Sequence, residues 1–219
     1  MFKKLLLLML FLLGPLSNAN SFYDLAGPDS NSIIYVNKNV VGGTGSGNSW
    51  ENAYKELADA LKWADQNKAL FSAVNPLQIW VAAGTYNPKY SPQDGTNRFT
   101  NKTRDNTFLL VDNVKVYGGF AGTETAFANR NWVTNVTILS GEIGSSTTIS
   151  DNAYHVVVSA GTSQHAVLDG FSITGGNGNV STTITINGKS CYRNYGGGIA
   201  DLNAATTYSN LIIYRNGAK

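Results

Sequence analysis

The acidic residues that follow residue 78 could support sugar chemistry if the fold brings them together. A polysaccharide lyase needs carboxylates that hold Ca²⁺ and a base such as Arg or Lys, and a glycoside hydrolase needs two carboxylates a few ångströms apart. The acidic residues of this region stand singly in the sequence: Asp94, Asp105, Asp112, Glu124, Glu142, Asp151, Asp169 and Asp201. The best catalytic candidates are Asp169, Asp201 and Arg193, although we expect Asp169 to cap backbone amides in a turn.

Histidine and cysteine offer no recognisable metal site. His155 and His165 have neither Cys nor carboxylate beside them, which zinc sites require. Residues 175–180 (GGNGNV) imitate a calcium-binding nonapeptide, but Val180 stands where an Asp must bind the ion. We therefore expect no metal and no cofactor, except that a lyase activity would require Ca²⁺. Cys191 is either a reactive thiol or a small buried side chain, and the second interpretation is favoured.

Aromatic residues are the remaining functional feature, because carbohydrate-binding grooves commonly present aromatic platforms. We expect the following aromatic side chains to be exposed: Trp80, Tyr86, Tyr90, Trp132, Tyr192 and Tyr195. Tyr192, Arg193 and Tyr195 lie in a long insertion between two strand repeats, where binding loops tend to occur. These three residues are the carbohydrate-binding candidates, and local packing of the aromatic rings under loops is the alternative.

Residues 1–19 have the features of a secretory signal peptide. Residues 3–4 (KK) are basic, residues 5–13 form an apolar run, and residues 17–19 (SNA) provide a cleavage site. The apolar run is too short to span a bilayer, and residues 14–15 (GP) interrupt it, which disfavours a membrane anchor. We expect a secreted or outer-surface protein whose mature chain has no transmembrane segment.

Charge and composition exclude some classes of protein. The chain has 16 Lys and Arg against 14 Asp and Glu, and Lys3 and Lys4 belong to the signal peptide, so the rest is balanced. A nucleic-acid partner is disfavoured, because binding to phosphates requires an excess of cations. Hydrophobic residues make up 42% of the chain and aromatic residues 11%, which is enough to form a folded core.

The hydrophobic pattern predicts one helix and a series of short strands. Residues 50–64 place apolar side chains on one helical face. From residue 78 onward, β-branched runs alternate with Gly and Asn at 78–81, 107–111, 114–117, 136–139, 155–158, 171–174 and 211–214. Strands without intervening helices exclude a doubly wound α/β sheet and leave an antiparallel sandwich or a parallel solenoid.

Self-similarity favours the solenoid. Residues 114–119 align with 136–141, 171–176 and 211–216, with apolar residues in the first and third places. One continuous interior should therefore contain Val114, Val116, Val136, Ile138, Phe171, Ile173, Leu211 and Ile213. The chain's 23 glycines and its many asparagines suit the left-handed corners that such coils need.

Several of these segments resemble exported right-handed parallel β-helix proteins of the pectin-lyase-like superfamily, particularly those related to bacterial polymorphic outer-membrane proteins. The matching segments are 79–86 (IWVAAGTY), 116–125 (VYGGFAGTET), 138–141 (ILSG), 168–176 (LDGFSITGG) and 196–199 (GGGI). One departure is Ile213, which stands where the FxxN motif of the polymorphic repeat has an aromatic residue.

The resemblance implies an all-β fold, with an N-terminal cap at residues 20–77 that contains the helix and the first coils of a right-handed parallel β-helix at 78–219. Since that superfamily includes lyases, hydrolases, adhesins and scaffolds, the fold implies no single activity. We expect a non-catalytic, adhesin-like or carbohydrate-contacting surface module whose partners are polysaccharides or cell-surface glycans. The alternative is a polysaccharide lyase or glycoside hydrolase. The chain stops soon after the strand at 211–214, so we also expect a truncated C-terminal end that self-associates through its open coil.

Overall fold

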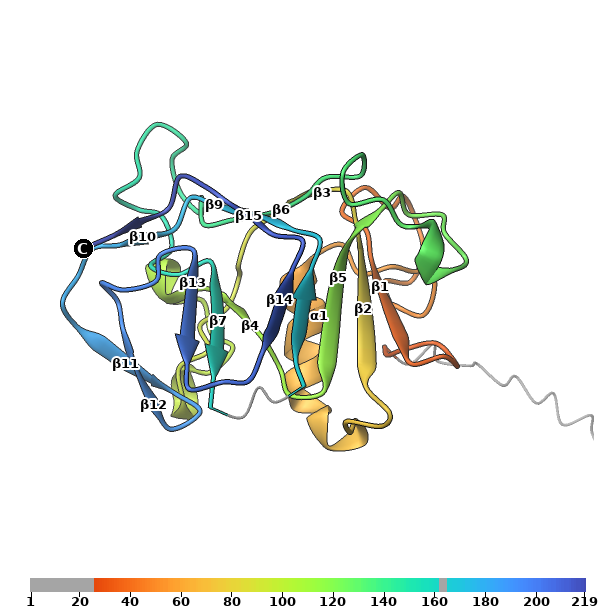
Figure 1. Ribbon diagram of the computed structural model, residues 1–219, viewed down its shortest axis with the longest axis horizontal. Helices are drawn as coiled ribbons and strands as arrows, with labels where there is room; N and C mark the ends of the chain where they lie inside the picture. Colours follow the sequence, from red (N-terminus) through yellow and green to blue (C-terminus); the bar gives the residue numbers. More distant parts are fainter. Residues whose placement is uncertain (1–25, 162–164) are drawn as a thin grey trace, which may run out of the picture.

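Short β-strands and one α-helix make up the computed structural model, which describes residues 26–161 and 165–219 (Figure 1). The proposed signal peptide therefore lies outside the described residues. Four single-turn 3₁₀ helices occur in loops, at Lys68–Leu70, Gly95–Asn97, Thr103–Asp105 and Phe127–Asn129. Among the described residues, none of the helices has the length and apolar character needed to cross a membrane.

Three parallel sheets organise the chain. The first sheet has the order β1-β2-β5-β8-β14 and the second the order β15-β9-β6-β3, while β13-β7-β4 form the third. The strands of the first sheet are β1 (Ile33–Val36), β2 (Leu77–Ala82), β5 (Val114–Phe120), β8 (Val167–Asp169) and β14 (Thr207–Ser209). Those of the second are β3 (Gly84–Tyr86), β6 (Thr137–Ser140), β9 (Ser172–Thr174) and β15 (Ile212–Ile213). Those of the third are β4 (Phe108–Leu109), β7 (Val157–Ala160) and β13 (Ile199–Leu202).

The chain visits these sheets in a recurring order. Strands β2, β3 and β4 enter the first, second and third sheets in turn, and β5, β6 and β7 repeat the sequence beside them. Strands β8, β9 and β13 follow the same order, although β10 (Asn177–Gly178) and a hairpin intervene before β13. β10 pairs in parallel with β16 (Gly217–Ala218). The molecule is therefore rich in β-structure, with parallel pairing between segments far apart in the sequence.

Apolar side chains stack in register inside the three sheets. On the first sheet, Ile34, Ile79, Val116 and Leu168 are successive partners, and all four are almost completely buried. Tyr86, Leu139 and Ile173 form the matching column on the second sheet. Burial of each such side chain contributes about 1.5–3 kcal/mol to stability, so these columns form the main core.

The predicted interior is correct at some positions and wrong at others. Val114, Val116, Phe171 and Ile173 are buried as expected. Val136, however, is 45% exposed, and Ile138 is only partly buried. The reason is register: β6 turns Thr137 and Leu139 inward, and a shift of one residue reverses every side chain of a strand.

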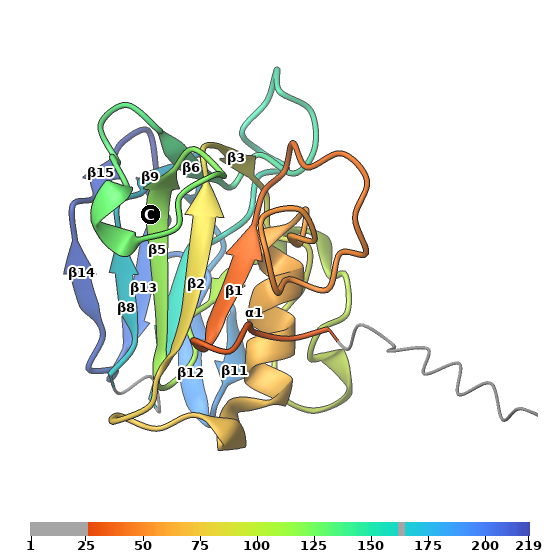
Figure 2. The same ribbon diagram turned by 90° about the vertical axis from the view of Figure 1, so that its right-hand side faces the viewer.

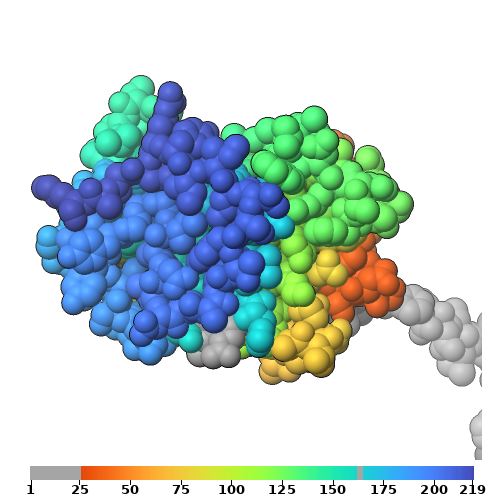
Figure 3. Space-filling view, viewed as in Figure 1, coloured from red at the N-terminus to blue at the C-terminus, as the bar shows by residue number. Residues whose placement is uncertain are grey.

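The last predicted pair is covered only in part. Leu211 packs against the main core from a partly buried position. Ile213 is the register partner of Ile173, yet it is 54% exposed. In Figure 3, the C-terminal segment is drawn in dark blue and lies on the outside of the molecule. The inner column of the second sheet thus ends at a side chain that no described strand covers.

The observed helix, α1 (Leu57–Gln66), is shorter than the predicted one and begins later. Tyr54 cannot join it, because its backbone N–H donates to the carbonyl oxygen of Tyr35 in β1. Helix α1 buries Leu57, Leu61 and Ala64 and lies beside β1 and β2 (Figure 2). Strand β1, which belongs to the predicted cap, is also the edge strand of the first sheet, so residues on both sides of the predicted boundary at 77/78 share one sheet.

Gly and Asn occupy the corners, as their abundance predicts. Gly170 and Asn210 follow the paired residues that end β8 and β14, and both have positive φ angles, of 83° and 50°. Gly161 and Asn203 follow the ends of β7 and β13, each with a φ of 57°. Left-handed backbone is strained for most side chains but tolerated by these two residue types, which suits them to these turns. Arg215, beside Gly175, is an exception with a φ of 51°.

An antiparallel hairpin covers the outer face of the third sheet. It consists of β11 (Thr183–Ile186) and β12 (Lys189–Tyr192), joined at the turn Asn187-Gly188. A second apolar cluster joins this hairpin to the sheet and contains Leu109, Val158, Ala160, Ile184, Ile186, Cys191 and Ala200. The hairpin therefore adds a separate layer outside the main core.

Candidate functional site

The structure does not unite the proposed catalytic residues Asp169, Asp201 and Arg193. Asp169 ends β8 in the first sheet, where its carboxylate pairs with Arg130 at 2.8 Å. Asp201 lies in β13 of the third sheet, and its carboxylate accepts a hydrogen bond from the Tyr208 hydroxyl at 3.0 Å. Each carboxylate thus has its own structural partner, and the two do not form a catalytic pair.

Arg193 anchors the base of the hairpin. Its guanidinium donates to both carboxylate oxygens of Asp105, at 2.6 and 2.9 Å. It also donates to the hydroxyl of Thr182 at 2.9 Å. The hydrogen bonds that Arg193 donates to Asp105 raise the pKa of Arg193. Because this bidentate pair occupies the guanidinium, Arg193 serves as a structural tie and does not line the groove described next.

The two tyrosine candidates do come together. Tyr192 and Tyr195 are 51% and 61% exposed, with ring centroids 5.8 Å apart. They line an open groove of about 300 Å³ whose other wall includes Asp201 and Leu202 of β13. We call this the tyrosine groove. It thus contains one proposed catalytic residue and two of the three proposed carbohydrate-binding residues.

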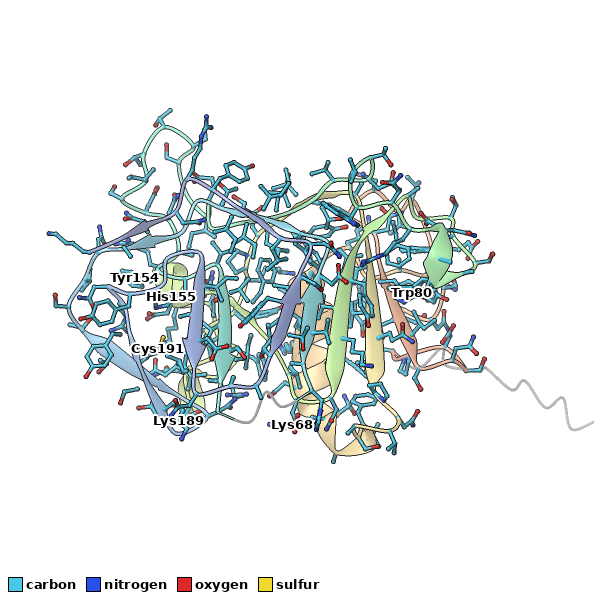
Figure 4. The ribbon with its side chains drawn as sticks, viewed as in Figure 1. Lys68, Trp80, Tyr154, His155, Lys189 and Cys191 are labelled. Atoms are coloured by element: carbon cyan, nitrogen blue, oxygen red, sulfur yellow. The ribbon has the colours of Figure 1, made fainter. Side chains whose placement is uncertain are left out.

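Two of the aromatic residues expected to be exposed are buried. Trp80 stacks on Phe120, with ring centroids 4.6 Å apart, on the outer face of the first sheet (Figure 4). Tyr86 points into the main core, and its hydroxyl donates to the carbonyl oxygen of Ala82 at 3.0 Å. Tyr90 and Trp132 are partly buried. The packing interpretation therefore holds for Trp80 and Tyr86.

A larger cleft lies between the β3–β4 segment and the loop after β6. Its volume is about 910 Å³, and its charged lining residues are Lys89, Arg104, Glu142 and Asp151. We call it the polar cleft. A site of this size is within the range of small-molecule sites, roughly 300–1,000 Å³. It is the larger of the two candidate sites, and sequence reasoning did not identify it.

Backbone amides of one loop hold both carboxylates of the polar cleft. Glu142 Oε1 accepts from the Gly144 N–H at 3.3 Å, and Asp151 Oδ2 accepts from the Ser145 N–H at 2.8 Å. Asp151 Oδ1 accepts no hydrogen bond from any described residue. Glu142 and Asp151 stand at opposite ends of this loop, so their sequence spacing gave no sign of a pair.

Arg104 also lines the polar cleft and is held in place by hydrogen bonds. Its Nε donates to the Asn152 carbonyl oxygen at 2.7 Å, and its Nη2 donates to Asn177 and Asn179. Its guanidinium lies 4.1 Å from the centre of the Tyr154 ring. Among described residues, no carboxylate pairs with Arg104 and none accepts from its Nη1. The cleft therefore presents a rigid, uncompensated guanidinium.

Cys191 is not a reactive thiol. Its side chain is completely buried in the hairpin layer, and burial raises its pKa to about 11. The sulfur lies 3.4 Å from His155 Nε2, and His155 Nδ1 lies 3.1 Å from the Gly196 carbonyl oxygen (Figure 4). Burial also lowers the pKa of His155. Both groups are therefore neutral near pH 7, which supports the packing interpretation of Cys191.

The described residues contain no group of three or more His, Cys, Asp or Glu side chains placed to hold a metal ion. No protein-family model, curated protein or solved structure matches this chain.

Proposed function

We propose that the chain is an exported module built as a right-handed parallel β-helix with an N-terminal cap. Three observations support the coil architecture: the recurring visits to three sheets, the parallel register, and the stacked left-handed corners at Gly and Asn. The resemblance of its motifs to the pectin-lyase-like superfamily adds to this support. The features of residues 1–19 support secretion or display on the outer cell surface.

The module contacts carbohydrate without cutting it. The observation that carries this proposal is the tyrosine groove, in which Tyr192 and Tyr195 present exposed rings beside the carboxylate of Asp201. A tyrosine ring offers an apolar face to the C–H groups of a sugar, and its hydroxyl hydrogen-bonds at the rim. Asp201 supplies acceptor lone pairs for sugar hydroxyls, although one of its oxygens also accepts from the Tyr208 hydroxyl and the other from the Ala204 N–H.

A glycan array tests this proposal, with detection of released sugars in the same samples. The mature chain should bind a subset of polysaccharide or cell-surface glycans and release no product. Replacing Tyr192 and Tyr195 by Ala should weaken that binding. Tyr214→Ala is the matched control, because Tyr214 is also exposed but lies outside the groove. Equal binding by the groove variant and the control would remove the tyrosine groove from the proposal.

A second candidate function is polysaccharide cleavage by a lyase or glycoside hydrolase. One observation favours it: the polar cleft brings two carboxylates, Glu142 and Asp151, to the same site as Arg104. A hydrolase would use the two carboxylates as an acid and base or nucleophile, and a lyase would add Ca²⁺ and use Arg104 or Lys89 as a base. Product release that Glu142→Gln or Asp151→Asn abolishes would establish this function in place of the first.

A further inference from the structure

The polar cleft presents hydrogen-bond donors and acceptors from two different segments. Arg104 offers the N–H groups of Nη1, while its other nitrogens and its stacking on Tyr154 hold the guanidinium in place. In the same cleft, the carboxylates of Glu142 and Asp151 are each held by one amide of their own loop. Both residues line the cleft, and the lone pairs of their carboxylates that no amide occupies can accept hydrogen bonds from a ligand, apart from those of Asp151 Oδ1, which is buried. The cleft is thus ready to bind a ligand that both donates and accepts.

The charge of the polar cleft is unbalanced. Lys89 Nζ lies 2.9 Å from the Asp59 carboxylate, so that carboxylate offsets its charge. Arg104 is then the one lining cation without a carboxylate partner among the described residues. Against it stand Glu142 and Asp151, neither of which forms an ion pair with a described residue. Two carboxylates therefore face a single guanidinium.

We propose that the polar cleft binds a neutral, hydroxyl-rich oligosaccharide and discriminates against uronate-rich chains. Each sugar hydroxyl can donate to Glu142 or Asp151 and accept from Arg104, so a neutral sugar satisfies both kinds of group. Every sugar unit of a polyuronate has a carboxylate. A polyuronate chain that spans the cleft would therefore place some of its carboxylates next to Glu142 and Asp151. Like charges at an interface reduce affinity for the wrong partner.

This assignment rests on the proposed function for its ligand class, but it concerns a different site from the tyrosine groove. It holds whether or not the bound glycan is cut. The two sites can therefore be tested separately with variants of the same chain.

Isothermal titration calorimetry on the mature chain is the direct test, with neutral oligosaccharides and oligogalacturonates of equal length as probes. We expect the best neutral probe to bind at least about tenfold more tightly than any oligogalacturonate at low salt. That ratio should shrink as salt is added, because salt screens exposed charges. Equal or tighter binding of oligogalacturonate would overturn the assignment.

Three variants test whether the preference for neutral oligosaccharides arises at the polar cleft. Glu142→Gln combined with Asp151→Asn removes both charges, so oligogalacturonate should gain affinity and the ratio of neutral-probe to oligogalacturonate affinity should fall toward one. Ser150→Trp should block the cleft, because Ser150 lines it. Ser146→Trp is the matched control in the same loop, since Ser146 is exposed and does not line the cleft.

The outcomes separate this inference from the proposed function. Loss of neutral-sugar binding in Ser150→Trp but not in Ser146→Trp supports the cleft. Binding that survives Ser150→Trp and disappears in the Tyr192 and Tyr195 variants overturns the cleft and leaves the proposed function standing. A chain that binds no glycan of either class overturns both.

Discussion

The carboxylate of Asp94 holds the turn of the hairpin at Gly188. Its Oδ2 accepts from the Gly188 N–H at 2.8 Å, and its Oδ1 accepts from the Asn187 N–H at the same distance. Arg98 connects this carboxylate to α1, because it also donates to Asp65 at 2.8 Å. The hairpin layer is therefore tied to the helix through a chain of charged hydrogen bonds.

Removal of the Asp94 carboxylate should loosen the hairpin. We expect Asp94→Ala to reduce the free energy of unfolding by about 1–3 kcal/mol, because it leaves two turn amides without their acceptor. Hydrogen exchange at the Asn187 and Gly188 amides should accelerate more than exchange in the first sheet. Asp94→Asn is the control, since it retains one acceptor oxygen and should lose less. Unchanged exchange at both amides would contradict this role.

Acid should destabilise the hairpin layer through His155. Burial lowers the folded-state pKa of His155 below its ordinary value of 6.5, against the smaller opposing effects of Gly196 and Asp105, while Arg193 adds to the lowering. The stability that the neutral ring contributes is fully present above about pH 6.5 and is lost as the pH falls toward the lower folded-state pKa. The loss should not exceed about 1.4 kcal/mol per pH unit.

Chemical denaturation between pH 5 and pH 7 measures this effect, over a window chosen to lie above most carboxylate titrations. His155→Gln should flatten the pH dependence of the free energy of unfolding, whatever its effect on absolute stability. His165→Gln, which changes an exposed histidine, should leave the dependence as it is. Identical slopes for the two variants would exclude His155 as its source.

Cys191 should resist alkylation in the folded protein. Its thiol has no exposed surface, and its pKa of about 11 keeps the reactive thiolate scarce at pH 8. We expect iodoacetamide to label the native chain far more slowly than the chain in urea, as followed by mass spectrometry. Asp94→Ala, which loosens the hairpin, should raise the native labelling rate. Rapid labelling of the unmodified native chain would mean that Cys191 is accessible.

The register of β6 predicts that substitutions at two adjacent residues reduce stability to very different extents. Leu139 is completely buried in the column between Tyr86 and Ile173, so Leu139→Ala should cost about 2–5 kcal/mol and Leu139→Asp should unfold the domain. Ile138 faces outward and is partly exposed, so Ile138→Asp should be tolerated far better. The denaturant midpoints of the two Asp variants measure this difference in stability. A larger fall in the midpoint of Ile138→Asp than of Leu139→Asp would support the register expected from the sequence.

These adjacent residues also show what the sequence could and could not predict. Residues 136–139 (VTIL) have apolar residues at three of four positions, so alternation alone does not say which face is buried. Here β6 turns the hydroxyl of Thr137 inward, where it accepts from the Gly119 N–H at 2.9 Å. Such a bond depends on a neighbouring strand and leaves no mark in the local pattern.

Of the two candidate sites, the sequence predicted the tyrosine groove but not the polar cleft. Tyr192 and Tyr195 are near neighbours in the chain, so a shared groove followed from their position in one insertion. Glu142 and Asp151 line one cleft because their loop closes on its own amides, which spacing does not reveal. The positive φ angles at Gly161, Gly170, Asn203 and Asn210 agree with the sequence expectation, since tolerance of positive φ is a local property of Gly and Asn.

The two edges of the first sheet differ in a way that predicts how this chain associates. At β1, the backbone N–H of Tyr35 donates to Gly47, and its carbonyl oxygen accepts from Tyr54, so the segment at residues 47–54 covers the edge. At the other edge, β14 pairs with β8 on one side only, within the described residues. Ile212 and Ile213 of β15 are more than half exposed beside it.

An uncovered parallel edge with apolar side chains is a template for another strand. We therefore expect the chain from residue 20 onward to self-associate in a concentration-dependent manner, as measured by light scattering. Because residues 47–54 cover the opposite edge, association should stop at small closed assemblies such as dimers, without extending into fibres. Replacing Ile212 and Ile213 by Lys should restore the monomer, whereas Val74→Lys, at an exposed site far along the chain, should not. A monodisperse monomer at high concentration would refute the prediction.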